Sequence, residues 1–155
     1  MDFPEWQMLV VGCGDMEHEL HRRARQSASP DRILLVGNQE DVPLWLNCMD
    51  VFCLPSYGDE GVPQALMQAM ACGVPAVSTP IGAISEALQD GVTGLMTPPR
   101  DSAQLTVTLD RLMRDPGLRK RFSDSATAYA QQNFGLKDML DSMERVFRSV
   151  VASSV

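Results

Sequence analysis

Short apolar runs alternate with helical segments over the first hundred residues, and this alternation constrains the fold more than any other feature. The runs are apolar throughout, which is typical of strands buried on both faces of a parallel sheet. The sequence therefore predicts an α/β domain with a Rossmann-like parallel sheet and helices on both faces. Strands are expected at 7–11, 33–36, 51–54, 76–78 and 94–96, and helices at 17–27, 42–49, 64–71 and 84–89.

Three more helices are expected after the last strand. Asp101 precedes Gln104 in the spacing of a capping box, and Asp115 precedes Pro116, which suits a first helical position. Two apolar stripes at helical spacing are interpreted as core or domain-packing faces rather than ligand sites. They are Leu105, Leu109 and Leu112, and then Leu136, Leu140, Met143, Val146, Phe147 and Val150.

Composition narrows the function classes. At 155 residues the chain has the length of one domain, and its net charge of −7 argues against binding to nucleic acid phosphates. The four cysteines form no CxxC pair and the two histidines lie elsewhere, so no metal site is predicted. No apolar run is long enough for a membrane span and no secretion signal is recognisable. We therefore expect a cytoplasmic location with reduced thiols.

An acidic loop that opens directly into a helix is the best clue to function. Glycines 58 and 61 flank Glu60, and Pro63 is expected at the first helical position. The start of such a helix presents unpaired N–H groups and a positive dipole end beyond a strand, which suits a phosphate or diphosphate. Glu60 has the chemistry to accept hydrogen bonds from sugar hydroxyls, and Asp59 is expected to be a solvated neighbour.

Two glycines follow the first strand in the run Gly12-Cys13-Gly14-Asp15. The third glycine of a dinucleotide-binding G-x-G-x-x-G is missing, because Glu17 stands in its place. Two interpretations therefore remain open: direct contact of Gly12 and Gly14 with a nucleotide, or simply a tight turn from strand to helix.

Taken in order, these segments resemble a known family over nearly the whole chain. The similar segments are Val10 to Gly14, Leu35 to Gly37 with Val42-Pro43, Asp50 to Ser56, Glu60 to Pro75, Asp90 to Leu95, and the helical tail. The family is that of the carboxyl-terminal, donor-binding domain of GT-B glycosyltransferases, in particular the retaining family 4. The resemblance implies one half of a GT-B fold, with a nucleotide sugar across the carboxyl ends of the strands. It also implies a second Rossmann-like domain for the acceptor, which is absent from this chain.

The resemblance assigns roles to particular residues. The family signature has two glutamates separated by seven residues, and Glu60 matches the first, a catalytic residue near the donor sugar. Gln68 occupies the second position, on the ribose hydroxyls, where an amide instead of a carboxylate would cost about 1 kcal/mol, or roughly fivefold in affinity. The implied phosphate donors are the N–H groups of Gly61, Val62, Gln64 and Ala65.

Several of these assignments have plainer alternatives. Asn38 and Gln39 match the segment beside the nucleobase, but their side chains could simply form a turn. Gln68 could be a solvated helix residue, and Glu60 could do no more than favour the positive end of the helix. Glu86 is interpreted as a structural cap or turn partner rather than a catalytic acid.

The sequence contains no Lys, Arg or His between residues 33 and 99. A departing nucleoside diphosphate develops negative charge that fixed cations normally stabilise. In the family an Arg and a Lys of the first strand–helix unit do this, and the resemblance places that unit upstream of residue 7. The sequence is therefore interpreted as a fragment. Arg32 and Arg100 flank the interval and could substitute, although a solvated strand start or loop is the simpler interpretation.

The predicted function is retaining transfer of a glycosyl group from a nucleotide sugar to a saccharide or lipid-linked acceptor, as in polysaccharide biosynthesis. No metal or other cofactor is expected, and the isolated chain should be inactive. Membrane association is expected only through the missing half. Two alternatives remain: a sugar-nucleotide epimerase of the same two-domain architecture, and a non-catalytic module that binds a nucleotide sugar or a protein.

Overall fold

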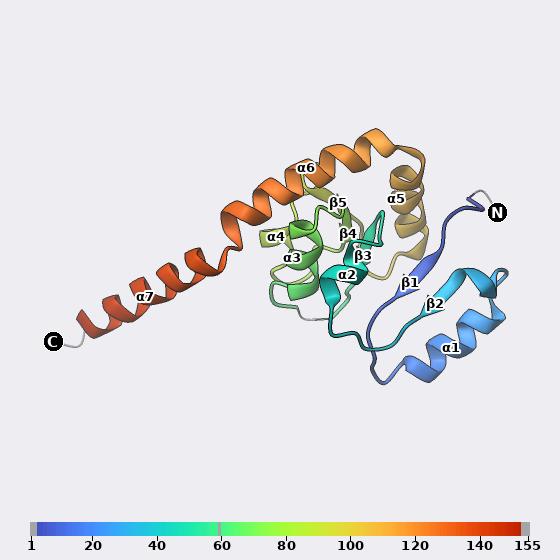
Figure 1. Cartoon of the computed structure of the whole chain (residues 1–155), viewed down its shortest axis with the longest axis horizontal. Helices are drawn as coiled ribbons and strands as arrows, with labels where there is room; N and C mark the ends of the chain where they lie inside the picture. The colour runs from blue at the N-terminus through green and yellow to red at the C-terminus, as the bar shows by residue number, and fades with distance from the viewer. Residues whose placement is uncertain (1–2, 59, 153–155) are drawn as a thin grey trace. The chain divides into compact units, whose positions relative to one another are not determined.

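The computed structural model describes residues 3–58 and 60–152. The chain divides into two compact units, residues 1–49 and 50–155 (Figure 1). The first unit contains β1 (Met8–Val10), α1 (Glu17–Gln26), a 3₁₀ turn η1 (Pro30–Arg32), β2 (Ile33–Leu35) and α2 (Val42–Leu46). Strands β1 and β2 are parallel, with Met8 opposite Ile33, and α1 is the crossover between them.

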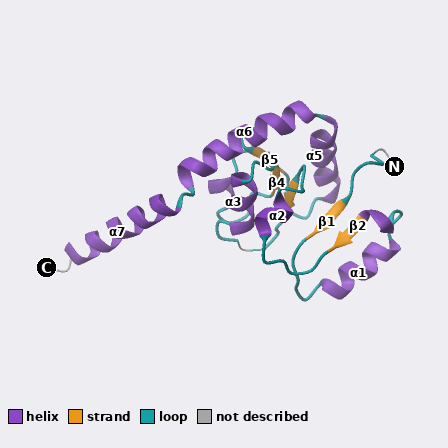
Figure 2. Ribbon diagram, viewed as in Figure 1, coloured by secondary structure: helices purple, strands orange, loops and turns teal. Residues whose placement is uncertain are grey.

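The second unit carries a three-stranded parallel sheet in the order β3-β4-β5 (Figure 2). Its elements are β3 (Phe52–Leu54), α3 (Gln64–Ala71), β4 (Ala76–Ser78), α4 (Ile84–Ala87), β5 (Gly94–Met96), α5 (Ser102–Arg114), α6 (Pro116–Asn133) and α7 (Leu136–Ala152). Because all three strands run the same way, the loops that follow them meet at one edge of the sheet.

Helices cover both faces of this sheet, as predicted for apolar parallel strands. Ala76 belongs to a core cluster with Leu66 and Met70 of α3 and Ile84 of α4, whereas its neighbour Val77 packs in a second cluster. The second cluster contains Leu112 of α5 together with Leu118 and Phe122 of α6, and α6 also contributes alanines to the first. Successive strand residues thus point to opposite, equally buried faces.

The predicted elements are confirmed, with differences at their ends. Helix α3 and strands β4 and β5 have the predicted bounds, but the helix expected at 42–49 ends at Leu46 and the one at 84–89 ends at Ala87. Among the described residues, the parallel strands pair as β1-β2 in the first unit and as β3-β4-β5 in the second. An apolar pattern predicts that a segment is a strand, but it does not tell which other strand that segment pairs with.

The two predicted caps of α5 and α6 are confirmed. The Asp101 carboxylate accepts a hydrogen bond from Gln104 N–H at 2.9 Å, and that of Asp115 accepts one from Leu118 N–H at 2.8 Å. Pro116 is the first residue of α6. These bonds satisfy N–H groups that the first turn of a helix leaves unpaired.

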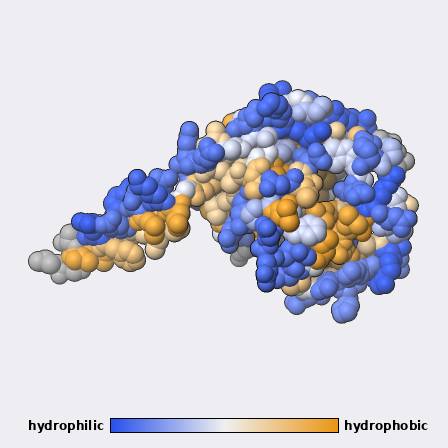
Figure 3. Space-filling view, viewed as in Figure 1, coloured by the Kyte–Doolittle hydropathy of each residue, from blue (hydrophilic) through white to orange (hydrophobic). Residues whose placement is uncertain are grey.

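The two apolar stripes differ in burial. Leu112 is buried and Leu105 and Leu109 pack against its cluster, so the first stripe is core as predicted. The second stripe, on α7, is exposed, with Leu140 at 53% and Phe147 at 64% of full exposure. It is not part of the core of the described residues, and its interpretation as a domain-packing face stays a prediction. Figure 3 shows these apolar side chains gathered along one side of α7. Helical spacing identifies an apolar face but does not tell what the face contacts.

Over residues 3–58 and 60–152, no helix is both long and apolar enough to cross a bilayer. In the same residues, no cluster of three His, Cys, Asp or Glu side chains is arranged to hold a metal ion. All four cysteines are free thiols.

Candidate functional site

The acidic loop between β3 and α3 forms the centre of the candidate site. Helix α3 begins at Gln64, so Pro63 is its N-cap and not, as the sequence suggested, its first helical residue. Pro63 lacks a side-chain cap, and within the described residues no acceptor pairs with the N–H groups of Gly61, Val62, Gln64 or Ala65. Four donors therefore surround the positive end of α3, an arrangement that suits an anion.

Glu60 is half-buried in this loop, and its side chain is held by a hydrogen bond. Ser56 Oγ donates a hydrogen bond to Glu60 Oε1 at 2.8 Å, and the carbonyl oxygen of Ser56 accepts one from Thr79 Oγ1 at 2.6 Å. The carboxylate is thereby tied to the ends of both β3 and β4. Both interpretations of Glu60, a contact with the donor sugar and an interaction with the positive end of α3 alone, stay predictions.

The backbone of Glu60 is held by the loop that follows β4. Its carbonyl oxygen accepts a hydrogen bond from Ala83 N–H at 3.1 Å, in the loop between β4 and α4. In that loop Gly82 adopts φ +55°, and a Cβ there would overlap the Glu60 carbonyl oxygen. The sequence predicted neither contact, because both join segments that are far apart along the chain.

Helix α3 carries the remaining candidate residues of this unit. Gln64 and Gln68 lie one turn apart and share a face, Gln64 exposed and Gln68 half-buried, while Leu66 and Met70 point into the core. No described residue forms a hydrogen bond with the side-chain amide of Gln68. Gln68 is thus available to a ligand, although its part in a site stays a prediction. Asp59 lies outside the described residues.

Charge is unevenly distributed around the loop. Residues 33–99 carry no basic side chain, and the first one beyond them is Arg100, which follows β5. Its guanidinium carbon lies 4.9 Å from the ring centroid of Tyr57, next to Ser56 in the acidic loop. Arg100 is also a non-glycine residue with positive φ, at +60°. The expected exposed loop position of Arg100 is confirmed, whereas its contact with the Tyr57 ring could not be predicted from the sequence.

Gly12 and Gly14 belong to the first unit, where they form the turn from β1 to α1. Gly12 has φ +123° and its N–H donates to the Gly37 carbonyl at 2.7 Å, while the Gly14 carbonyl accepts from Glu17 N–H at 3.0 Å. This geometry is that of a tight turn. The same glycines line a hollow of about 300 Å³ above the turn, so the geometry also leaves nucleotide contact open.

Asn38 and Gln39 follow β2 in this unit and differ in their contacts. Gln39 forms the turn: its Nε2 donates to the Val36 carbonyl at 2.7 Å, and its Oε1 accepts from Trp45 Nε1 at 3.0 Å. Asn38 is exposed. Of the two, only Asn38 therefore keeps a side chain available for the predicted contact with a nucleobase.

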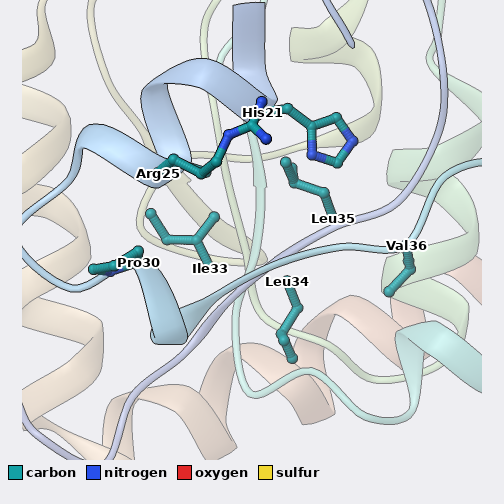
Figure 4. Close-up of a pocket in the computed structure, with 8 residues that line it drawn as sticks. His21, Arg25, Pro30, Ile33, Leu34, Leu35 and Val36 are labelled. Carbon is teal, nitrogen blue, oxygen red and sulfur yellow. The ribbon is translucent and has the colours of Figure 1, made fainter. Parts of the chain in front are cut away.

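A second hollow of about 300 Å³ lies between α1 and β2 (Figure 4). His21 and Arg25 of α1 and the apolar side chains of Ile33 and Leu35 line it. None of the predicted donor-site residues is among its walls, so it does not take part in the candidate site.

Comparison with known proteins assigns the chain to a family. The family model described as "Glycosyl transferases group 1" matches residues 2–115. The chain belongs to this family. It is 42% identical over 111 residues to the Vi polysaccharide biosynthesis protein VipC/TviE of Salmonella typhi, which covers 72% of the chain and 18% of that protein. It is 31% identical over 153 residues to the phosphatidyl-myo-inositol mannosyltransferase of Mycobacterium leprae, covering 97% and 40%.

Solved structures share the fold of this group 1 chain. Anabaena HepE in complex with UDP superposes with a TM-score of 0.88 at 23% identity, over 94% of this chain and 42% of that one. A sucrose-phosphate synthase from Thermosynechococcus elongatus gives 0.88 at 22% identity, over 98% and 40%. These neighbours share the Rossmann-like α/β fold of this chain. The chain spans less than half the length of each of these proteins.

Proposed function

We propose that this chain is the nucleotide-sugar-binding part of a retaining, family 4-like glycosyltransferase. The whole enzyme would move a glycosyl group from a nucleotide donor to a saccharide or lipid-linked acceptor, held by a second domain. One observation carries the proposal. In a chain of the glycosyl transferase group 1 family, Glu60 lies in the loop that leads into α3 at the carboxyl edge of a parallel sheet, and four backbone N–H groups of that loop and of the first turn of α3 have no acceptor among the described residues.

In this proposal the diphosphate of the donor lies at the start of α3. The N–H groups of Gly61, Val62, Gln64 and Ala65 donate to its oxygens, and the dipole of α3 favours their negative charge. Pro63 contributes no donor, so the phosphate is held on either side of it. Solved HepE complexes with UDP and with UDP-glucose support a uridine diphosphate donor as the first to test.

Glu60 would orient the donor sugar. Because Ser56 Oγ occupies one lone pair of Oε1, the carboxylate keeps Oε2 for the sugar hydroxyls. Gln68 lies one turn beyond Gln64 on the same face of α3, and its side-chain amide would accept hydrogen bonds from the ribose hydroxyls. For Gly12, Gly14 and Asn38 of the first unit, the family resemblance implies contact with the nucleotide.

The bond from the anomeric carbon to the diphosphate breaks in the transfer, and negative charge grows on the departing phosphate. In this proposal an Arg and a Lys of a preceding strand–helix unit, rather than a metal ion, balance that charge. Residues 33–99 supply no cation for this step. We therefore expect the isolated chain to bind donor without turnover, and turnover of a sugar nucleotide by this chain would contradict the assignment.

The role of Glu60 can be tested by calorimetric titration of UDP and UDP-glucose. Glu60→Gln keeps the acceptor for Ser56 but loses the charge, so we expect UDP-glucose to bind about tenfold more weakly while UDP is little changed. Glu86→Gln is the matched control, because Glu86 is an exposed acid at the start of another helix of the same unit. Equal losses in the two variants would sink the role proposed for Glu60.

A non-catalytic binding module is the second candidate. The absence of basic residues over 33–99 and the amide at Gln68 favour it, since both weaken a transferase site. The discriminating test adds the upstream unit to the chain: sugar transfer to any acceptor would exclude a binding module, and tight donor binding without transfer would favour it.

A further inference from the structure

The loop after β4 closes directly on Glu60, and one residue of that loop leaves no room for a side chain. A Cβ on Gly82 would overlap the carbonyl oxygen of Glu60 and lie 2.9 Å from its carbonyl carbon and 3.1 Å from its nitrogen. Backbone atoms cannot move aside as the end of a flexible side chain can. Any residue other than glycine at position 82 must therefore push the two loops apart.

The same contact is a hydrogen bond as well as a close approach. Gly82 has φ +55°, a left-handed conformation that turns the chain so that the next N–H, that of Ala83, donates to the Glu60 carbonyl at 3.1 Å. Glu60 thus forms a hydrogen bond with the loop after β4 through its backbone carbonyl and one with Ser56 through its carboxylate. Two independent contacts fix where the carboxylate points.

Among the described residues of this unit, Gly91 is a glycine with a left-handed backbone and open space around it. Gly91 has φ +72° and no heavy atom within 4 Å of a Cβ built on it. Gly73, at the end of α3, would meet only the side-chain oxygens of Ser123 and Thr127 at 3.1 Å. The backbone overlap with the acidic loop is therefore a property of Gly82 and not of glycine turns in this unit generally.

We propose that Gly82 is a positioning residue for Glu60: its missing side chain lets the loop after β4 close on the acidic loop and set the carboxylate toward the donor sugar. This inference rests on the proposed function of Glu60. Gly82 itself touches no substrate. It acts by holding the Glu60 backbone, so its loss should remove the contribution of the Glu60 carboxylate and leave the diphosphate donors at Gln64 and Ala65, on the well-packed α3, in place.

The first test needs no ligand. In Gly82→Ala we expect the amide of Ala83 to exchange with solvent roughly tenfold faster than in the wild-type chain, because its hydrogen bond to Glu60 is lost. The amide resonances of Glu60 and Gly61 should also move. Gly91→Ala is the matched control: it introduces the same strained alanine without the overlap. Equal Ala83 exchange in the two variants would overturn the proposal.

The second test separates positioning from general stability by a double-mutant cycle on UDP-glucose affinity. Glu60→Gln should weaken binding about tenfold in the wild-type and Gly91→Ala backgrounds and have little effect in Gly82→Ala, where the carboxylate is already misplaced. A merely structural role would lower stability in Gly82→Ala without erasing the effect of Glu60→Gln. An undiminished effect in that background would overturn the proposal.

Ala83→Pro provides a milder variant should Gly82→Ala fail to fold. Ala83 has φ −93°, within about 30° of the value that proline imposes, and the change removes the N–H donor while adding no Cβ at position 82. We expect the Glu60 and Gly61 amide resonances to shift and the Glu60→Gln effect to shrink. Unshifted resonances would count against the positioning role. If UDP-glucose binds neither to the wild-type chain nor to a chain that also carries the upstream strand–helix unit, the proposed function is refuted, and the exchange test of Gly82 is then decided by itself.

Discussion

At the scale of single residues, the amide at position 68 is the plainest departure from the family signature. Gln68→Glu should tighten nucleotide binding about fivefold, since charge-assisted hydrogen bonds to the ribose hydroxyls replace neutral ones. Titration calorimetry with UDP measures this directly. Gln132→Glu, on the exposed face of α6, is the control for added charge. The gain should vanish with a 2′,3′-dideoxy nucleotide; a gain that persists there would show that Gln68 does not meet the ribose.

At the scale of elements, burial rather than apolar character decides which leucines stabilise the fold. Leu112 on α5 is fully buried and Leu140 on α7 is 53% exposed. We expect Leu112→Ala to lower the free energy of unfolding by about 2–5 kcal/mol and Leu140→Ala by less than about 0.5 kcal/mol. Urea unfolding followed by circular dichroism compares the two. A large loss at Leu140 would mean that α7 packs on the rest of the chain in solution.

Helix α6 provides a second prediction at this scale. Asp115 caps its first turn, whereas Asp124 forms only an exposed ion pair with Lys120. Asp115→Ala should cost about 1 kcal/mol of unfolding free energy. Asp124→Ala, on the same helix, should cost less, because exposed pairs contribute little. Thermal unfolding at two salt concentrations separates them: only the effect of Asp124→Ala should fade with salt, and an equal response would contradict the capping assignment.

Much of this element structure could be predicted from the sequence, and the reasons are local. The bounds of α3 and β4 follow from an apolar pattern interrupted by Gly73 and Pro75, and the caps at Asp101 and Asp115 follow from residue type. The close contact between Gly82 and the Glu60 backbone could not be predicted, because it joins two loops that are far apart along the chain and meet only when the sheet has formed. The exposure of the apolar face of α7 could not be predicted either, since its sequence pattern is that of any amphipathic helix.

At the scale of the whole molecule, the two units differ in how much core they contain. Both described core clusters lie in residues 50–155, whereas the buried apolar residues of the first unit are Ala24 and Leu46. Amides of β1 and β2 should therefore exchange with solvent at least about tenfold faster than those of β4. Hydrogen exchange by NMR measures both in one sample. Equal protection would indicate that the units unfold as one.

The central claim is that the acidic loop and the start of α3 hold a nucleotide sugar. A two-dimensional amide NMR titration with UDP, GDP, ADP and their sugar conjugates tests it most directly. We expect saturable shifts at residues 61–68 with one base, and loss of the sugar-dependent shifts in Glu60→Ala. Saturable shifts confined to other residues would contradict the claim, as would the absence of shifts at millimolar ligand in a chain that also carries the upstream strand–helix unit.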